Sequence, residues 1–258
     1  MPPSALSPQA VSDYYDRWTE RYEAAFGDTF QSNRTADLDV LFEHIAGQAE
    51  LAPGQRVLDA GCGVGGPALW LVRRHGVAVD GVTISVLQAE KARRKAKATG
   101  LGDRARFFSG DFHDLAALNG ELAPAEGYDA VLFLESLVHS HRPEIALGEA
   151  ARMLRPGGVL YVKDLFRRRE PLHGEEERRV ERAVRNTNRH FRLEVQSTGR
   201  IERGLRQAGL ELESFGELPI ATQHDLGNAF CQEHAIDIYE GEPVTYLDWL
   251  ELKARKPR

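Results

Sequence analysis

Cysteine is scarce in this chain of 258 residues, and its scarcity excludes two classes of protein. Only Cys62 and Cys231 occur, too few for a disulfide framework or a zinc quartet. We therefore predict two reduced thiols, no structural metal and a cytoplasmic location. Met1–Asp16 has no basic stretch followed by an apolar one, and nowhere do about 20 apolar residues run together, so neither a signal peptide nor a membrane span is expected.

A surplus of positive charge is missing as well. The chain carries 33 lysines and arginines against 39 aspartates and glutamates, a formal net charge of −6. Because proteins that bind duplexes usually present a net basic face, we expect a small-molecule partner and no nucleic acid. The length fits one compact domain with additions, and it leaves open whether the chain forms a homo-oligomer.

Beyond residue 50, short apolar strands alternate with amphipathic helices. This alternation predicts an α/β fold, a parallel sheet with helices on both faces. Strands are expected at 56–59, 77–82, 105–109, 128–133 and 159–165, with helices at 66–74, 86–99 and 143–154. A charged helical insertion should follow at 167–196, then a helix at 198–208, a strand at 211–217, a loop or helix at 221–241 and a strand at 245–254. One member of the final strand pair is expected to be antiparallel.

A glycine-rich turn follows the first strand and reads Asp59-Ala60-Gly61-Cys62-Gly63-Val64-Gly65-Gly66. Such a turn between a strand and a helix suits nucleotide binding, because glycine lets a ligand approach the main chain. No Gly-Lys-Ser/Thr follows, so it is not a P-loop. The Asp59 carboxylate would repel a pyrophosphate and suits a cationic ligand. The alternative is a tight turn that only packs helix on strand.

With two further motifs, this turn resembles the class I S-adenosylmethionine-dependent methyltransferases. The motifs are VLDAGCGVGG at 57–66, YDAVLFLESLVH at 128–139 and MLRPGGVLYVKDLF at 153–166, in the family's order and spacing. The resemblance covers about residues 51–165. It implies a Rossmann-like sheet, S-adenosylmethionine as cofactor, and methyl transfer to an acceptor that it does not identify.

The resemblance also implies a set of cofactor-binding residues. Asp59, Gly61 and Gly63 belong to the first turn, and Asp111 with Phe112 takes the position that binds the adenine amino group and flanks its ring. Where the family usually has a ribose-binding acid, this chain has Thr83. That stretch looks like the GxTxSxxQ pattern of tocopherol and sterol C-methyltransferases, which implies a ribose site made of Thr83, Ser85 and Gln88.

Candidate catalytic groups follow the fourth and fifth strands, because ligands bind beyond the carboxyl ends of parallel strands. Glu135, His139 and Glu170 could each remove a proton. The alternatives are a cap or salt bridge for Glu135 and a packing role for His139. His139 and His141 have no third ligand nearby, so no metal site is predicted.

Two groups of residues are candidates for substrate binding. Arg167, Arg168 and Arg169 could bind a phosphate or carboxylate, or could simply start a solvated helix. Tyr14, Tyr15 and Tyr22, together with Trp18, fall on an expected helix at 8–26 that could close as a lid. Their rings could equally serve only to pack that helix.

These observations predict four segments. They are an N-terminal helical lid at 1–50 with a second helix at 35–49, a cofactor-binding core at 51–165, a charged helical insertion or substrate cap at 166–197, and a C-terminal completion of the sheet at 198–258.

The favoured reaction is C-methylation of an anionic alkene such as an isoprenoid diphosphate, which Mg²⁺ could accompany. The alternative is N- or O-methylation of an amine or hydroxyl metabolite. A catalytically inactive partner subunit is a further reading. RNA methylation is disfavoured, since Glu-Ser-Leu-Val stands where an Asn-Pro-Pro-Tyr-type motif would be needed.

Overall fold

The computed structural model describes residues 6–118, 122, 126–170, 172–223 and 225–258; residues 1–5 of the expected lid lie outside this part. Its described strands form a seven-stranded sheet in the order β3-β2-β1-β4-β5-β7-β6. The strands are β1 Arg56–Ala60, β2 Ala78–Thr83, β3 Ala105–Ser109, β4 Tyr128–Leu134, β5 Leu154–Arg167, β6 Glu211–Glu217 and β7 Leu247–Arg255. β7 runs antiparallel to both β5 and β6. The Rossmann-like α/β prediction is confirmed.

Helices cover both faces of the sheet, as the alternation predicts. The helices are α1 Pro8–Phe26, α2 Leu38–Gln48, α3 Gly66–His75, α4 Val86–Ala98, α5 Pro143–Met153, α6 Gly174–Phe191, α7 Thr198–Gln207 and α8 Asp225–Glu233, with 3₁₀ turns η1 Leu115–Leu118 and η2 Leu137–His139. Alternate residues of β1 point to opposite faces. Val57 packs in a cluster with α2, α3 and α4, whereas Leu58 packs in a second cluster with α5 and α7.

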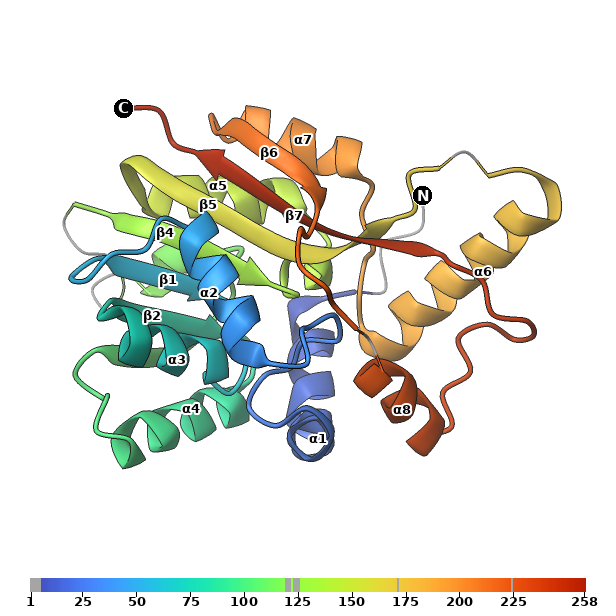
Figure 1. Cartoon of the computed structure of the whole chain (residues 1–258), viewed down its shortest axis with the longest axis horizontal. Helices are drawn as coiled ribbons and strands as arrows, with labels where there is room; N and C mark the ends of the chain where they lie inside the picture. The colour runs from blue at the N-terminus through green and yellow to red at the C-terminus, as the bar shows by residue number, and fades with distance from the viewer. Residues whose placement is uncertain (1–5, 119–121, 123–125, 171, 224) are drawn as a thin grey trace.

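Three helices lie beyond the carboxyl ends of the strands rather than on the faces of the sheet. Figure 1 shows α1, α6 and α8 gathered at this end. α1 begins where Ser7 caps it by accepting a hydrogen bond from the backbone N–H of Ala10, and it ends at Gly27 with φ 67°. None of the described helices is both long and apolar enough to cross a membrane.

The strand after the Pro156-Gly157-Gly158 turn differs from the prediction at both ends. β5 begins at Leu154, because Leu154 already pairs with Tyr128 and a register shift between Tyr128 and Ala130 accommodates the turn inside the strand. It also continues to Arg167, which pairs with Leu247 of β7. The helical insertion therefore starts later than expected, as α6 at Gly174.

Candidate active site

The glycine turn lies between β1 and α3 and is fixed to β2. The backbone N–H groups of Gly61 and Cys62 both donate to the Val82 carbonyl. Gly61 has φ 98°, and a Cβ there would lie 2.3 Å from Cβ of Ser136. Packing against Ser136 is therefore enough to require glycine at this position. Gly63 is different: a Cβ would meet nothing closer than Phe30 at 3.8 Å. That open side is where a ligand can contact the main chain.

Asp59 is a buried carboxylate, 2% exposed, directly before this turn. Burial raises its pKa to about 7. Within the described residues, no hydrogen bond or ion pair engages its carboxylate. A buried acid beside an open glycine fits a ligand that brings its own positive charge, and these residues therefore fit the amino group of S-adenosylmethionine.

The predicted ribose set is engaged by protein groups. Thr83 Oγ1 donates to Gln88 Oε1 at 2.7 Å, and Gln88 Nε2 donates to Thr19 Oγ1 of α1 at 3.2 Å. Ser85 caps α4 by accepting from the Gln88 N–H and also bonds to Asp16 of α1. The structure thus brings Thr83, Ser85 and Gln88 together, but in an arrangement that holds α1 against α4.

Asp111 and Phe112 lie directly beyond the end of β3. Asp111 Oδ1 accepts two hydrogen bonds from His113, from its backbone N–H at 2.9 Å and from its ring Nδ1 at 2.6 Å. Phe112 is partly buried and packs edge-on against Phe133, with ring centroids 5.5 Å apart. The structure thus places one carboxylate next to one aromatic ring, and the adenine-binding role of this pair stays a prediction.

Glu135 connects the sheet to the segment that follows α1 through hydrogen bonds and an ion pair. Its carboxylate accepts from the backbone N–H groups of Ser32 at 2.7 Å and Asn33 at 3.2 Å, and it pairs with Lys163 Nζ. Lys163 is fully buried and also donates to Gln31 at 2.9 Å. Glu135 has φ 54°, in the left-handed region, a strain that such fixed partners can hold.

His139 forms the clearest chemical pair in the site. Its Nδ1 lies 2.8 Å from the Arg192 carbonyl, which can only accept, so Nδ1 carries the hydrogen. Burial lowers the pKa of His139 to about 4, so the ring is neutral at pH 7. Its Nε2 therefore accepts from the Tyr15 hydroxyl at 2.8 Å. Burial also raises the pKa of Tyr15 well above its ordinary value.

A cavity of about 810 Å³ opens beside this pair. Tyr15, Tyr22, Glu135 and His139 are among its lining residues, together with aromatic and aliphatic side chains of α6, α8 and residues 236–249. Tyr14 is not among them; its hydroxyl bonds to that of Tyr22 at 2.8 Å. Among the described residues that line the cavity, there is no lysine or arginine.

The three arginines at the end of β5 and directly after it lie elsewhere. They line a smaller hollow of about 320 Å³ with Glu181, Ser197 and Thr198, because β5 passes the cavity at Leu165 before it reaches Arg167. Each is paired: Arg167 with Glu181, Arg168 with Glu170 and Glu176, and Arg169 with Asp248. The structure does not bring Arg167, Arg168, Arg169 or Glu170 to the cavity that His139 lines.

Sequence reasoning missed two parts of this site. One is Lys163. A single lysine inside an apolar strand was the available signal, because a buried lysine needs a partner of opposite charge. The other is α8, whose Phe230 stacks on Tyr22 with centroids 4.8 Å apart. No local pattern identifies that contact.

Comparison with known proteins gives the family. A methyltransferase-domain family model matches residues 57–158. Methyltransferase GfsG of Streptomyces halstedii is 34% identical over 165 residues, 60% of this chain and 57% of that protein. Sterol 24-C-methyltransferase ERG6B of Gibberella zeae is 35% identical over 156 residues, 58% of this chain and 40% of that protein. The chain thus matches less than two thirds of either relative.

Two further likenesses extend along more of the chain. The 27-O-demethylrifamycin SV methyltransferase of Amycolatopsis mediterranei is 33% identical over 208 residues, 80% of this chain and 72% of that protein. The crystal structure of the [4+2]-cyclase SpnF aligns with a TM-score of 0.79 at 24% identity, covering 99% of this chain and 98% of that one; at this identity it shows the fold alone. The chain belongs to the class I S-adenosylmethionine-dependent methyltransferases.

Proposed function

We propose that this protein transfers the methyl group of S-adenosylmethionine to a hydroxyl oxygen of a large, mostly apolar and uncharged small molecule. The observation that carries the proposal is the neutral Tyr15–His139 pair beside an 810 Å³ cavity whose described lining has no lysine or arginine. Ligand cavities of this size accept drug-sized molecules. The rifamycin relative, an O-methyltransferase by its name, supports the same class of acceptor.

The bound cofactor would supply an electrophilic methyl group on a sulfonium. His139 would take the proton of the attacking hydroxyl through Tyr15, which would give its own proton to Nε2 as it receives the substrate's. An oxygen–methyl bond would form as the sulfur–methyl bond breaks, and the proton would end on His139. A hydroxyl oxygen that gains a methyl group becomes a strong acid, so a weak base of pKa about 4 suffices.

Neutral groups also suit the charge of this reaction. A protonated histidine beside the cavity would repel the sulfonium, whereas neutral His139 does not. The aromatic rings of Tyr15, Tyr22, Phe26 and Phe30 line the same cavity, and aromatic faces attract cations. These side chains can therefore exclude water and hold a positively charged methyl donor against an apolar acceptor.

The anionic alkene favoured by the sequence is not supported by this cavity. A buried diphosphate needs cationic partners, and the described lining offers none. The described residues include no group of three or more His, Cys, Asp or Glu, so any Mg²⁺ would have to be held largely by the diphosphate itself. C-methylation of an uncharged alkene is the second candidate. The aromatic lining and the likeness to sterol 24-C-methyltransferases favour it.

A substrate panel tests the proposal. The protein is incubated with S-adenosylmethionine carrying a trideuteriomethyl group and with a hydroxylated macrolactone, a sterol, geranyl diphosphate or a small amine. Mass spectrometry then locates the label. We expect transfer to oxygen of the macrolactone and none to geranyl diphosphate. Label on an alkene carbon of the sterol would support the second candidate, and transfer only to the diphosphate or the amine would overturn the proposal.

A further inference from the structure

His113 connects two parts of the site that belong to different strands. Its ring Nδ1 and backbone N–H both bond to Asp111 Oδ1, after β3, while its Nε2 lies 2.6 Å from Ser140 Oγ, after β4 and η2. A carboxylate can only accept, so Nδ1 carries the hydrogen, and in the neutral ring Nε2 accepts from the Ser140 hydroxyl. The result is one hydrogen-bonded chain from Asp111 to Ser140.

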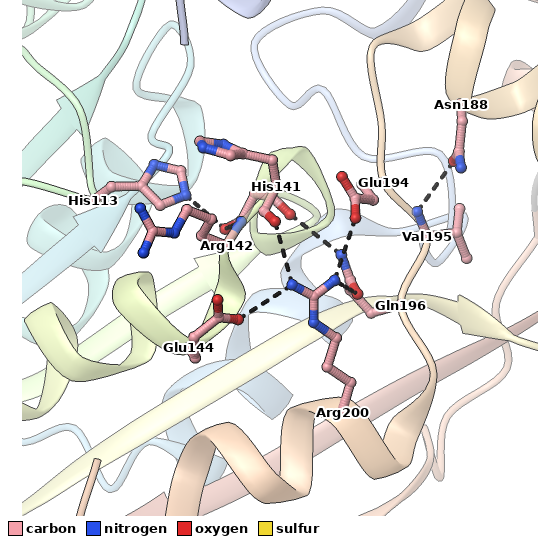
Figure 2. Close-up of polar contacts among 10 residues, drawn as sticks. His113, His141, Arg142, Glu144, Asn188, Glu194, Val195, Gln196 and Arg200 are labelled. Carbon is pink, nitrogen blue, oxygen red and sulfur yellow. Dashed lines mark hydrogen bonds and ion pairs between the residues drawn. The ribbon is translucent and has the colours of Figure 1, made fainter. Parts of the chain in front are cut away.

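Ser140 is itself held firmly. It is fully buried, its Oγ accepts from the Arg142 N–H at 3.2 Å, and its carbonyl accepts from Gln196 Nε2 at 3.3 Å. Gln196 in turn accepts from Arg200 at 2.9 Å. Figure 2 shows Arg200 reaching from α7 to Glu144, Glu194 and Gln196 around this turn. Ser140 therefore offers His113 a fixed point.

This arrangement leaves one oxygen of Asp111 available. Both bonds from His113 go to Oδ1, and among the described residues no hydrogen bond reaches Oδ2. Burial raises the pKa of Asp111, but the bonds from His113 outweigh it and hold the pKa below its ordinary value. Asp111 thus stays an ionised acceptor, with its side chain 28% exposed.

We propose that His113 and Ser140 are positioning residues that orient Asp111 for the 6-amino group of the cofactor's adenine. They fix Oδ1, which leaves Oδ2 for the ligand, and they join that acceptor to the turn that carries His139. His113 also packs on Phe112, with ring centroids 4.7 Å apart. This contact restricts the orientation of the Phe112 ring beside the same ligand. This inference rests on the binding of S-adenosylmethionine, on which the proposed function also depends.

The test compares two ligands that differ only at the group in question. Calorimetry measures the Kd of S-adenosylhomocysteine and of its 6-deamino analogue, which has hydrogen in place of the 6-amino group. A charge-assisted hydrogen bond predicts that the wild-type protein prefers the adenine ligand by about tenfold or more. His113→Leu should reduce this preference to within about threefold. A merely structural defect would weaken both ligands equally and leave the ratio unchanged.

Conservative variants sharpen the comparison. His113→Asn can still donate from the place of Nδ1 and should retain most of the preference, whereas Ser140→Ala should lose part of it. His141→Leu is the control, because that ring packs on His113 at 5.0 Å but does not bond to Asp111. Thermal unfolding checks that each variant is folded; if His113→Leu is not, His113→Asn and Ser140→Ala carry the test.

Two outcomes would overturn the inference. An unchanged ratio in folded His113→Leu and Ser140→Ala would remove the positioning role while leaving the proposed methyl transfer intact. A wild-type ratio near one would show that Asp111 does not bind the amino group. Failure of the substrate panel with tight binding of S-adenosylhomocysteine would instead count against the proposed reaction alone.

Discussion

The Tyr15 hydroxyl donates to Nε2 of His139 across 2.8 Å, although 124 residues separate the two in the chain. Tyr15 belongs to α1, which covers the carboxyl end of the sheet, whereas His139 belongs to η2 after β4. The pair exists only while α1 is closed on the core. Closure of the N-terminal helix would therefore complete the proton acceptor, as lids do in other enzymes.

Removal of the Tyr15 hydroxyl should reduce turnover more than cofactor binding. We expect Tyr15→Phe to lower kcat, and His139→Leu to lower it by about a hundredfold or more, as loss of a general base does. The Kd of S-adenosylhomocysteine should change by less than about threefold, because neither group belongs to the glycine turn. Single-turnover kinetics and calorimetry measure the two quantities.

Tyr14→Phe is the matched control for this experiment. Tyr14 is also a buried tyrosine of α1, but its hydroxyl bonds to Tyr22 and it does not line the cavity. Turnover in Tyr14→Phe should stay near the wild-type value. Equal losses in Tyr14→Phe and Tyr15→Phe would mean that the hydroxyls only hold α1.

Stability below neutral pH should depend on His139. Burial lowers its pKa from 6.5 to about 4. Between these values the unfolded chain binds a proton that the folded chain does not, so the free energy of unfolding falls as pH falls. Between pH 7 and 5 this contributes a loss of about 2 kcal/mol, which His139→Asn should lack.

Urea unfolding at pH 7, 6 and 5 measures the difference between the two proteins. Asp59 and Asp164, whose pKa values burial raises to about 7, titrate in the opposite sense. Both proteins contain them, so their contribution cancels in the comparison. Parallel pH profiles for wild type and His139→Asn would contradict a neutral, buried imidazole.

Asp59 should make cofactor affinity depend on pH. Its raised pKa of about 7 means that the carboxyl is partly protonated in the free protein at neutral pH. A ligand ammonium group favours the ionised form, so binding releases a proton below pH 7, and the Kd of S-adenosylhomocysteine should rise up to about tenfold per pH unit as pH falls. Calorimetry in two buffers of different ionisation enthalpy detects that proton.

Asp59→Asn separates this effect from general acid sensitivity. The amide cannot titrate, so binding should be weaker at pH 8 and should vary little down to pH 6. A Kd that rises equally in wild type and Asp59→Asn would show that the proton belongs to another group.

The sequence predicted the parts of this molecule that depend on local pattern. Strand and helix alternation gave the sheet, and the helix at 8–26 matches α1 residue for residue. The turn around Gly61 and Gly63 was predicted because its glycines and the preceding acid, Asp59, are close together in the sequence. The start of β5 was missed because the break at Pro156 is a bulge paired with β4, and that pairing is not local.

Side-chain partners were less predictable than strand ends. His139 was identified as a candidate base, but its orientation depends on the Arg192 carbonyl and on Tyr15, both distant in sequence. The arginines from Arg167 to Arg169 also followed a strand end. Position alone could not indicate that β5 extends past the cavity and turns them toward carboxylates of α6 and β7.

Glu135 and Lys163 should behave as a structural pair. Lys163→Met would leave a buried carboxylate without its cation, and breaking such a pair costs about 3–5 kcal/mol. Glu135→Gln combined with Lys163→Met removes both charges, so the double variant should be more stable than Lys163→Met alone. Chemical denaturation of the wild type and the three variants completes the cycle.

The same variants show whether Glu135 has a structural role or acts as the catalytic base. If Glu135 only fixes Gln31–Asn33 over the sheet, folded Glu135→Gln should keep most of the turnover that His139→Leu loses. A Glu135→Gln protein with native stability and a hundredfold lower kcat would instead assign the proton transfer to Glu135.

The arginines at the end of β5 should be dispensable for an uncharged substrate. Arg167, Arg168 and Arg169 are partly exposed, each is paired with a carboxylate, and none lines the cavity beside His139. Single replacement by alanine should leave the substrate KM within about twofold of wild type, because the side chain removed does not line the cavity. The variants should also stay folded, because exposed ion pairs contribute little to stability. Phe191→Ala removes a ring that lines the cavity on α6. This change should raise the substrate KM and leave cofactor affinity unchanged. A several-fold rise in KM for any arginine variant, with KM unchanged in Phe191→Ala, would place the substrate in the arginine-lined hollow and restore an anionic acceptor as the better choice.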